Sequence, residues 1–239
     1  MNDLKFNEIL RSGAPVHLIG IGGVSMRALA KMLKNMGANV RGSDRDSSIY
    51  TLQLDEQGIP VAIGHRPDNV RDAGLIIRTA AIHDDNPEIA AARAAGIPVI
   101  SRAEAWGFIM AHYSKVVCIS GTHGKTSTTA MIATFTQSAQ LDPTVMVGGD
   151  LPSIGGTLRI GEGDLFVAEA CEYTNSFLKF FPKHEIILNI EAEHLDFFKD
   201  LDDIRTSFKK YADILPENGL LVINGDIPNV EYIYNDIKC

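Results

Sequence analysis

Two apolar stretches of this chain each lead straight into a glycine-containing turn, and each turn is followed by a stretch with helical periodicity. These stretches are Val16–Gly20 and Val116–Ser120, 100 positions apart. A strand that ends in a glycine turn and continues as a helix is the building unit of parallel sheets with helices on both faces. The pattern therefore predicts an α/β fold with two such units in series.

The rest of the sequence continues this alternation. The further strand candidates are continuous apolar runs, typical of buried parallel strands; they are Val40–Ser43, Leu75–Thr79, Leu165–Glu169, Glu185–Ile190 and Leu220–Asn224. Apolar residues at helical spacing and helix-end signals predict helices from Val24 to a C-terminal Gly37, over Asn86–Ala95, from Lys125 to about Ala139, and from Leu201 to Leu215. Pro228–Ile237 is similar to the start of a further helix.

The composition narrows the class of protein. The formal net charge is −8, from 22 Lys+Arg and 30 Asp+Glu, which argues against a nucleic-acid binder because such a protein needs a basic surface. No apolar run approaches the ~18 residues of a membrane span, and the first residues lack a signal-peptide pattern. Three scattered cysteines fit a reducing compartment. We therefore expect a cytoplasmic protein without a membrane span.

The first glycine turn, Gly20–Met26, reads GIGGVSM. Glycines at a strand end let backbone N–H groups approach a diphosphate, and the N-terminus of the next helix adds partial positive charge. Asp44 ends the next predicted strand, 22 residues after Gly22, at a spacing that suits an acid bonded to a ribose hydroxyl. Three interpretations remain open: a turn without a ligand, a dinucleotide site, and a site for a nucleotide-sugar diphosphate.

The second glycine turn is the most specific motif in the chain. Residues 121–127 read GTHGKTS. The loop is shorter than the G-x-x-x-x-G-K-[ST] phosphate loop, because only two residues separate Gly121 from Gly124, but the strand–loop–helix context is the same. Backbone N–H groups of such a loop surround phosphates. Lys125 would reach the β- and γ-phosphates, and the hydroxyl of Thr126 would bind Mg²⁺. The loop therefore predicts a nucleoside triphosphate site.

Acidic residues and a histidine follow two later strands. Glu169 ends one predicted strand, where an unpaired buried carboxylate would be costly, so we expect it to bind the metal ion. Glu172 lies three residues further on, and His194 follows the next strand as a candidate third partner. Cys171 has no identifiable base beside it, so we expect it to be unreactive. We expect His17, inside the first strand, to be a core histidine.

The segments HLIGIGGVSM, GTHGKTSTT, VAEACEYTNSF and NIEAEHLD together resemble the Mur ligase family, over residues 16–224. The GIGG and EAEHLD segments are most similar to members that act on UDP-N-acetylmuramate. The resemblance implies a cytoplasmic enzyme of peptidoglycan precursor synthesis, and hence of cell shape and cell division. Its reaction would join L-alanine to UDP-N-acetylmuramate with ATP and Mg²⁺, through an acyl phosphate.

The resemblance also implies roles for individual residues. Lys125, Glu169 and His194 would be catalytic, with Thr126 and Glu169 on one Mg²⁺ and His194 on a second. The ATP site would comprise Gly121, Thr122, His123, Gly124, Lys125, Thr126 and Ser127. The UDP-sugar site would comprise Gly22, Gly23, Val24, Ser25 and Met26 at the diphosphate, and Ser43, Asp44, His65 and Thr79 on the uridine side. Two positions depart from the family pattern: Ser25 replaces a glycine, and Cys171 replaces an aspartate.

We therefore expect a Rossmann-like UDP-sugar domain over residues 1–112 and the front part of a P-loop ATPase α/β domain over residues 113–239. The alternation stops soon after Leu220–Asn224, so we expect a truncated chain that lacks a C-terminal domain and is inactive alone. Three alternatives stay open. One is a recycling ligase that adds a peptide to UDP-N-acetylmuramate, another is a NAD-dependent dehydrogenase based on Gly20–Gly23 and Asp44, and the third is a binding module without catalysis.

Overall fold

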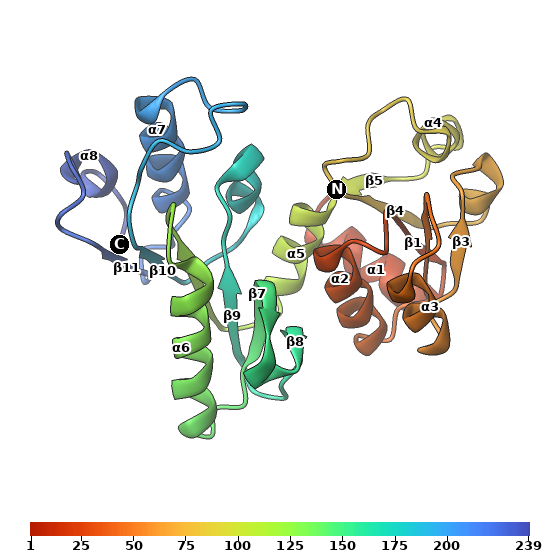
Figure 1. The fold of residues 1–239 in the computed structure, drawn as a ribbon, viewed down its shortest axis with the longest axis horizontal. Coiled ribbons are helices and arrows are strands. Elements are labelled where there is room, and N and C mark those ends of the chain that lie inside the picture. Colours follow the sequence, from red (N-terminus) through yellow and green to blue (C-terminus); the bar gives the residue numbers. More distant parts are fainter. The chain divides into compact units, whose positions relative to one another are not determined.

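The computed structural model describes all residues, 1–239, and the chain divides into two compact units, Met1–Trp106 and Gly107–Cys239. Helix α5 (Arg102–Met110) crosses this division. The division falls before the expected domain boundary after His112. Each unit has its own sheet, and each is described separately below (Figure 1).

The first unit is built on a five-stranded sheet in the order β3-β2-β1-β4-β5, in which every pair is parallel. Its strands are β1 (Val16–Ile19), β2 (Val40–Asp44), β3 (Val61–Ile63), β4 (Leu75–Arg78) and β5 (Val99–Ser101). All four residues of the central strand β1 are buried. Strands β3 and β5 were not predicted, because three-residue strands carry too few apolar side chains to stand out in a sequence.

Helices α1 (Asp3–Ser12), α2 (Val24–Asn35), α3 (Ile49–Glu56) and α4 (Pro87–Ala94) cover this sheet, with a 3-10 turn, η1 (Pro67–Val70), before β4. Helix α2 turns Met26, Leu29 and Leu33 toward the core, at the spacing expected for one helical face. Helix α4 begins as predicted, with Asn86 accepting a hydrogen bond from the Glu88 N–H and Pro87 in the first turn.

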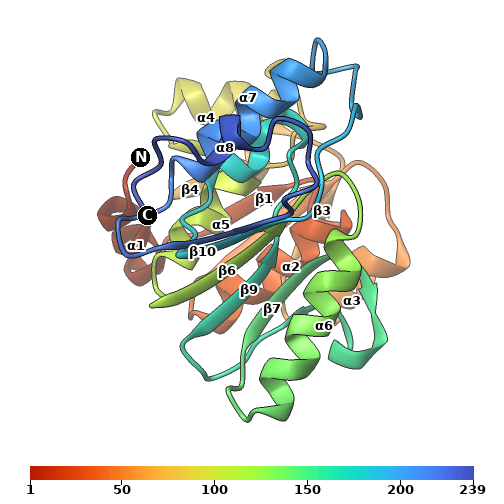
Figure 2. The same ribbon diagram turned by 90° about the vertical axis from the view of Figure 1, so that its left-hand side faces the viewer.

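The second unit is built on a six-stranded sheet in the order β11-β10-β6-β9-β7-β8. Its strands are β6 (Lys115–Ser120), β7 (Thr144–Leu151), β8 (Gly156–Arg159), β9 (Leu165–Glu169), β10 (His184–Ile187) and β11 (Leu220–Ile223). Figure 2 shows β10, β6, β9 and β7 side by side in this order. All pairs are parallel except β7 and β8, which are antiparallel. Strands β7 and β8 were not predicted, because glycines interrupt their apolar pattern, among them Gly148 and Gly149.

Helices α6 (Lys125–Ser138), α7 (Leu201–Ala212) and α8 (Glu231–Tyr234) belong to the second unit, with 3-10 turns η2 (Pro152–Ile154) and η3 (Tyr173–Lys179). Helix α7 buries Ile204, Phe208 and Tyr211, and the Tyr211 ring stacks on Phe177 at a centroid distance of 4.2 Å. The helix expected over Pro228–Ile237 is a single turn of four residues. No helix in the structure is both long and apolar enough to span a membrane.

Candidate functional site

The loop between β6 and α6 is held in shape by the segment that follows β10. Asn189 accepts a hydrogen bond from the Thr122 N–H at 3.1 Å through its backbone carbonyl and one from the His123 N–H at 2.7 Å through Oδ1. Its side-chain NH₂ donates to the His123 carbonyl at 3.0 Å. At Gly121 the φ is 133°, and a Cβ atom there would lie 3.1 Å from the Asn189 backbone. Glycine is therefore required where the loop passes Asn189, a contact that the sequence analysis did not anticipate.

Lys125 begins helix α6, and its side chain folds back over the loop. Its ammonium group donates to the Gly121 carbonyl at 2.5 Å and to the Thr122 carbonyl at 3.0 Å. It also pairs with Glu172, with Nζ to Oε2 at 3.2 Å and side-chain exposures of 13% and 3%. Two shielded opposite charges at this distance stabilise each other more strongly than an exposed pair. The cation of Lys125 is therefore held against the backbone of the loop by two carbonyls and one carboxylate.

Thr126 and Glu169 come together at the carboxyl ends of β6 and β9. The Thr126 hydroxyl lies 3.1 and 3.0 Å from the two carboxylate oxygens of Glu169. The Gly148 N–H donates to Oε2 of Glu169 at 2.8 Å. A Cβ on Gly148 would lie 3.2 Å from the same oxygen, so the glycine lets β7 approach the carboxylate. A hydroxyl beside a carboxylate is an oxygen ligand set that suits Mg²⁺.

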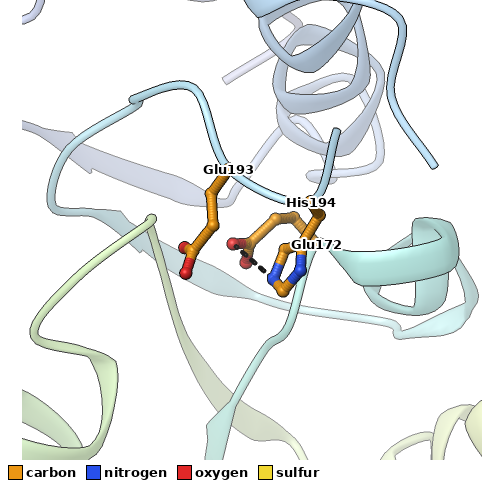
Figure 3. Close-up of side chains that lie close together, drawn as sticks. All are labelled: Glu172, Glu193 and His194. Carbon is orange, nitrogen blue, oxygen red and sulfur yellow. Dashed lines mark ion pairs between the residues drawn. The ribbon is translucent and has the colours of Figure 1, made fainter. Parts of the chain in front are cut away.

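Glu172, Glu193 and His194 form a second cluster beside the loop (Figure 3). Their ligand atoms lie within 4.8 Å of one another, and His194 Nε2 is 3.9 Å from Glu172 Oε1. Figure 3 shows the three side chains converging, with Glu172 coming from the segment after β9 and the other two from the segment after β10. The cluster has the donor types of a divalent metal site. Of its three residues, only His194 was predicted from the sequence to bind a metal ion.

The position of His194 is fixed by its backbone and by a neighbouring ring. Its φ is 55°, a left-handed value that non-glycine residues seldom adopt. The imidazole packs on the Tyr173 ring at a centroid distance of 4.5 Å, and the Tyr173 hydroxyl donates to Asp196 at 2.7 Å. A strained backbone at a packed side chain is common where a residue must point at a ligand.

Other predicted residues of this loop have different surroundings. His123 is exposed and lies 3.7 Å from Glu191, while Ser127 is exposed on α6. Cys171 lies between Glu169 and Glu172 in the sequence, and burial raises the pKa of its thiol. A thiol with a raised pKa is a poor nucleophile at neutral pH, which agrees with the expectation that Cys171 is unreactive.

In the first unit, the glycine turn between β1 and α2 is tied to β2. The Gly20 and Ile21 N–H groups donate to the Ser43 carbonyl, at 2.8 and 3.0 Å. The Gly22 N–H donates to Asp44 Oδ2 at 2.8 Å, and a Cβ on Gly22 would lie 2.9 Å from that oxygen. Gly23 is the N-cap residue of α2 and, having no side chain, provides no cap hydrogen bond. The N–H groups of the first turn of α2 therefore have no side-chain acceptor, as an anion site requires.

The remaining residues expected around the UDP-sugar fall into separate places. Val24 is exposed, whereas the side chain of Met26 is buried, so only the backbone of Met26 can face a ligand. Thr79 follows β4, on the opposite side of β1 from Asp44 and His65. The Ser43 side chain is completely buried and donates a 2.6 Å hydrogen bond to Glu88. Ser43 is therefore buried, whereas Asp44 and His65 are partly exposed to solvent.

Residues 15–114 match the profile described as "Mur ligase family, catalytic domain", and residues 119–239 match the "Mur ligase middle domain". The chain belongs to the Mur ligase family. The predicted fold class is confirmed by this match and by the solved structures similar to it, Mur ligases among them.

Individual Mur ligases are similar over the full length of the chain. It is 52% identical over 240 residues to UDP-N-acetylmuramate–L-alanine ligase of Lachnospira eligens, covering 100% of this chain and 51% of that protein. The crystal structure of UDP-N-acetylmuramate-alanine ligase from Thermotoga maritima matches with a TM-score of 0.79 at 33% identity, over 90% of this chain and 50% of that one.

A third relative is a Mur ligase of different specificity. The UDP-N-acetylmuramate:L-alanyl-gamma-D-glutamyl-meso-diaminopimelate ligase from Neisseria meningitides matches with a TM-score of 0.84 at 28% identity, over 91% of this chain and 73% of that one. Against the curated relatives that it matches, the chain spans about half of their length.

Proposed function

We propose that this chain supplies the UDP-sugar and ATP sites of a ligase that joins L-alanine to UDP-N-acetylmuramate in the cytoplasm, for peptidoglycan synthesis. The observation that carries the proposal is the placement of Lys125, Thr126 and Glu169 around one glycine loop, beside the cluster of Glu172, Glu193 and His194. The ~50% identity to UDP-N-acetylmuramate–L-alanine ligases supports this activity over that of a peptide-recycling ligase.

The second unit would bind ATP and Mg²⁺. The loop N–H groups of residues 121–124 and the ammonium group of Lys125 would hold the phosphates. Thr126 and Glu169 would hold one Mg²⁺, and the cluster would hold a second through Glu172, Glu193 and His194. When bound, the metal ions neutralise charge that develops on the transferred phosphate.

The first unit would bind UDP-N-acetylmuramate along the carboxyl edge of its sheet. Gly22 and Gly23 would admit the diphosphate to the N-terminus of α2, together with the backbone of Val24, Ser25 and Met26. Asp44 would accept a hydrogen bond from the ribose and His65 would lie beside the uridine. Ser43 would not touch the nucleotide with its side chain, which is buried and hydrogen-bonded inside the unit. Thr79 would lie on the other side of the diphosphate.

The proposed reaction has two steps. A carboxylate oxygen of the muramate attacks the γ-phosphorus of ATP, so ADP leaves and an acyl phosphate forms. The amine of L-alanine then attacks the acyl carbon, inorganic phosphate leaves, and the amine loses a proton to form the amide. Lys125 would stay with the phosphoryl oxygens as charge moves onto them, which is where fixed cations lower the barrier most.

Calorimetric titration of the 239-residue chain with UDP-N-acetylmuramate, ATP with Mg²⁺, and NAD⁺ tests this proposal. We expect binding of the first two ligands and none of NAD⁺. Binding of NAD⁺ with no response to UDP-N-acetylmuramate would instead support a dehydrogenase. Phosphate release that depends on L-alanine, measured with UDP-N-acetylmuramate, ATP and Mg²⁺, tests the complete reaction.

A further inference from the structure

A buried carboxylate lies below the carboxyl edge of the first sheet and has no role in the function described above. Glu88, in the first turn of α4, is completely buried. One of its oxygens accepts a hydrogen bond from the Ser43 hydroxyl at 2.6 Å and lies 3.2 Å from His65 Nδ1 and 3.6 Å from His17 Nε2. The other oxygen accepts from the side-chain NH₂ of Asn69.

These partners keep Glu88 ionised. Burial by itself would raise the pKa of the carboxyl, but hydrogen bonds from His17, Ser43 and Asn69 outweigh it and lower the pKa to about 2. A buried anion with this many donors requires each neighbour to present a hydrogen atom, because a lone pair facing a carboxylate is repelled.

The protons around Glu88 can then be assigned one by one. The single hydroxyl proton of Ser43 is committed to the carboxylate, so Ser43 Oγ can only accept from other groups. His65 Nδ1 lies 3.2 Å from both Ser43 Oγ and Glu88 Oε2, and both of these atoms are acceptors. Nδ1 of His65 must therefore carry the proton. In the neutral ring, Nε2 is then a hydrogen-bond acceptor.

The order of the strands shows which part of a nucleotide would meet His65. In the function proposed above, the glycine turn at the end of β1 would receive the diphosphate; Asp44 ends the neighbouring strand β2, and His65 follows β3, the strand beyond it. The Gly64 N–H donates to the Asp44 carbonyl at 2.8 Å, which keeps His65 next to Asp44. Adjacent strands are ~4.8 Å apart, so a nucleotide laid along this edge places ribose at Asp44 and base at His65.

We propose that Glu88 is a positioning residue that holds His65 as the Nδ1-protonated tautomer, so that His65 Nε2 accepts a hydrogen bond from the imide N–H of uracil. Cytosine carries a lone pair on the equivalent ring nitrogen and would be rejected. The proposal rests on the UDP-sugar function proposed above and adds a residue that selects the base.

The tautomer is measured without any ligand. We expect the ¹⁵N NMR shifts of His65 in the free chain at pH 8 to report a protonated Nδ1 and an unprotonated Nε2. Glu88→Gln should move the ring toward a mixture of tautomers, because an amide can present either a donor or an acceptor. The control Glu56→Gln, an exposed carboxylate at the end of α3, should leave the shifts unchanged. An Nε2-protonated His65 in the unmutated chain would overturn the proposal.

Base selection is measured by calorimetry with UDP and CDP. The unmutated chain should bind UDP at least roughly tenfold more tightly than CDP, because an unpaired buried polar group is costly. Glu88→Gln and His65→Ala should bring the ratio close to one, and His65→Gln, which retains an acceptor, should restore part of it. An unchanged ratio with intact UDP binding would overturn this inference alone. Failure to bind either nucleotide, with the expected tautomer still present, would instead count against the proposed function.

Discussion

Lys125 Nζ lies 3.2 Å from Glu172 Oε2, so the cation of the glycine loop is paired with a carboxylate that also belongs to the cluster with Glu193 and His194. Both side chains of the pair are shielded from solvent. The Glu172 carboxylate can therefore pair with two cations. It pairs with Lys125 when the loop is empty, and it could bind a divalent cation when Lys125 pairs with a phosphate instead. Release of Lys125 to a phosphate and capture of a metal ion by Glu172 would favour each other.

This relationship predicts an unusual effect of Glu172→Gln on nucleotide binding. Without its counter-charge, Lys125 should bind phosphate more readily, so the affinity for ADP in the presence of EDTA should rise several-fold. The enhancement of ATP affinity by Mg²⁺ should decrease at the same time, because one metal ligand is lost. Calorimetry with and without Mg²⁺ measures both. Glu162→Gln, an exposed carboxylate of the same unit, is the control, and a fall in Mg²⁺-free affinity would contradict the prediction.

Replacement of Lys125 itself should have the opposite result. Lys125→Met keeps the length of the side chain but removes its charge, and we expect the affinity for ATP with Mg²⁺ to fall by at least ~100-fold. The loop also loses the hydrogen bonds to the Gly121 and Thr122 carbonyls, so a small decrease in melting temperature is expected. Lys210→Met, on the exposed side of α7, should change neither quantity. Retained ATP binding would place the phosphate site elsewhere.

The glycine loops and the strands that lead into them could be predicted from sequence because their signals are local. Val116–Ser120 and the helix from Lys125 occur as predicted, within one or two residues. Strands β7 and β8 could not be predicted, because their pairing depends on β9 and on a turn rich in glycine. Strand β10 ends at Ile187, before the expected Ile190, because the chain turns there to bind the loop through Asn189.

In the candidate site, too, only residues with a local sequence signal could be predicted. Glu169 stood out because it ends an apolar strand, and it is found beside Thr126. Glu88 gave no such signal, since a glutamate in the first turn of a helix is ordinary on a protein surface. Its burial depends on Ser43, His65 and Asn69, which lie 45, 23 and 19 residues away. Contacts of this kind between distant segments cannot be read from spacing.

Gly23 provides a test of the diphosphate site that spares the fold. Its backbone, with φ −64° and ψ 144°, suits any residue, and an added Cβ would meet only the Gly20 carbonyl at 3.4 Å. Gly23→Val should therefore melt within a few degrees of the unmutated chain. We expect its affinity for UDP-N-acetylmuramate, measured by calorimetry, to fall at least roughly tenfold because the side chain blocks the approach of the phosphates. Gly225→Val, where nothing lies within 4 Å of an added Cβ, is the control. Unchanged affinity would move the diphosphate away from α2.

Glu185 on β10 predicts how the stability of the second unit depends on pH. The side chain is completely buried, and both of its carboxylate oxygens lack a hydrogen-bond partner. Burial, with a smaller contribution from the charge of Asp213, raises the pKa of this carboxyl to about 9. An unfolded glutamate ionises near pH 4.3. Between these values the folded chain binds a proton that the unfolded chain does not, so stability falls as pH rises.

Glu185→Gln removes this titration while keeping the shape of the protonated acid. We expect its melting temperature to match that of the unmutated chain near pH 3, where the carboxyl is largely protonated in both states, and to exceed it increasingly from pH 6 to pH 9. A gain of several degrees at pH 8 is the expected size, since ~1 kcal/mol shifts the midpoint of a domain of this size by a few degrees. Scanning calorimetry across this pH range measures the difference. Glu217→Gln, an exposed carboxylate before β11, should show none, and a gain for Glu185→Gln that does not change with pH would show that the carboxyl is ionised in the folded chain.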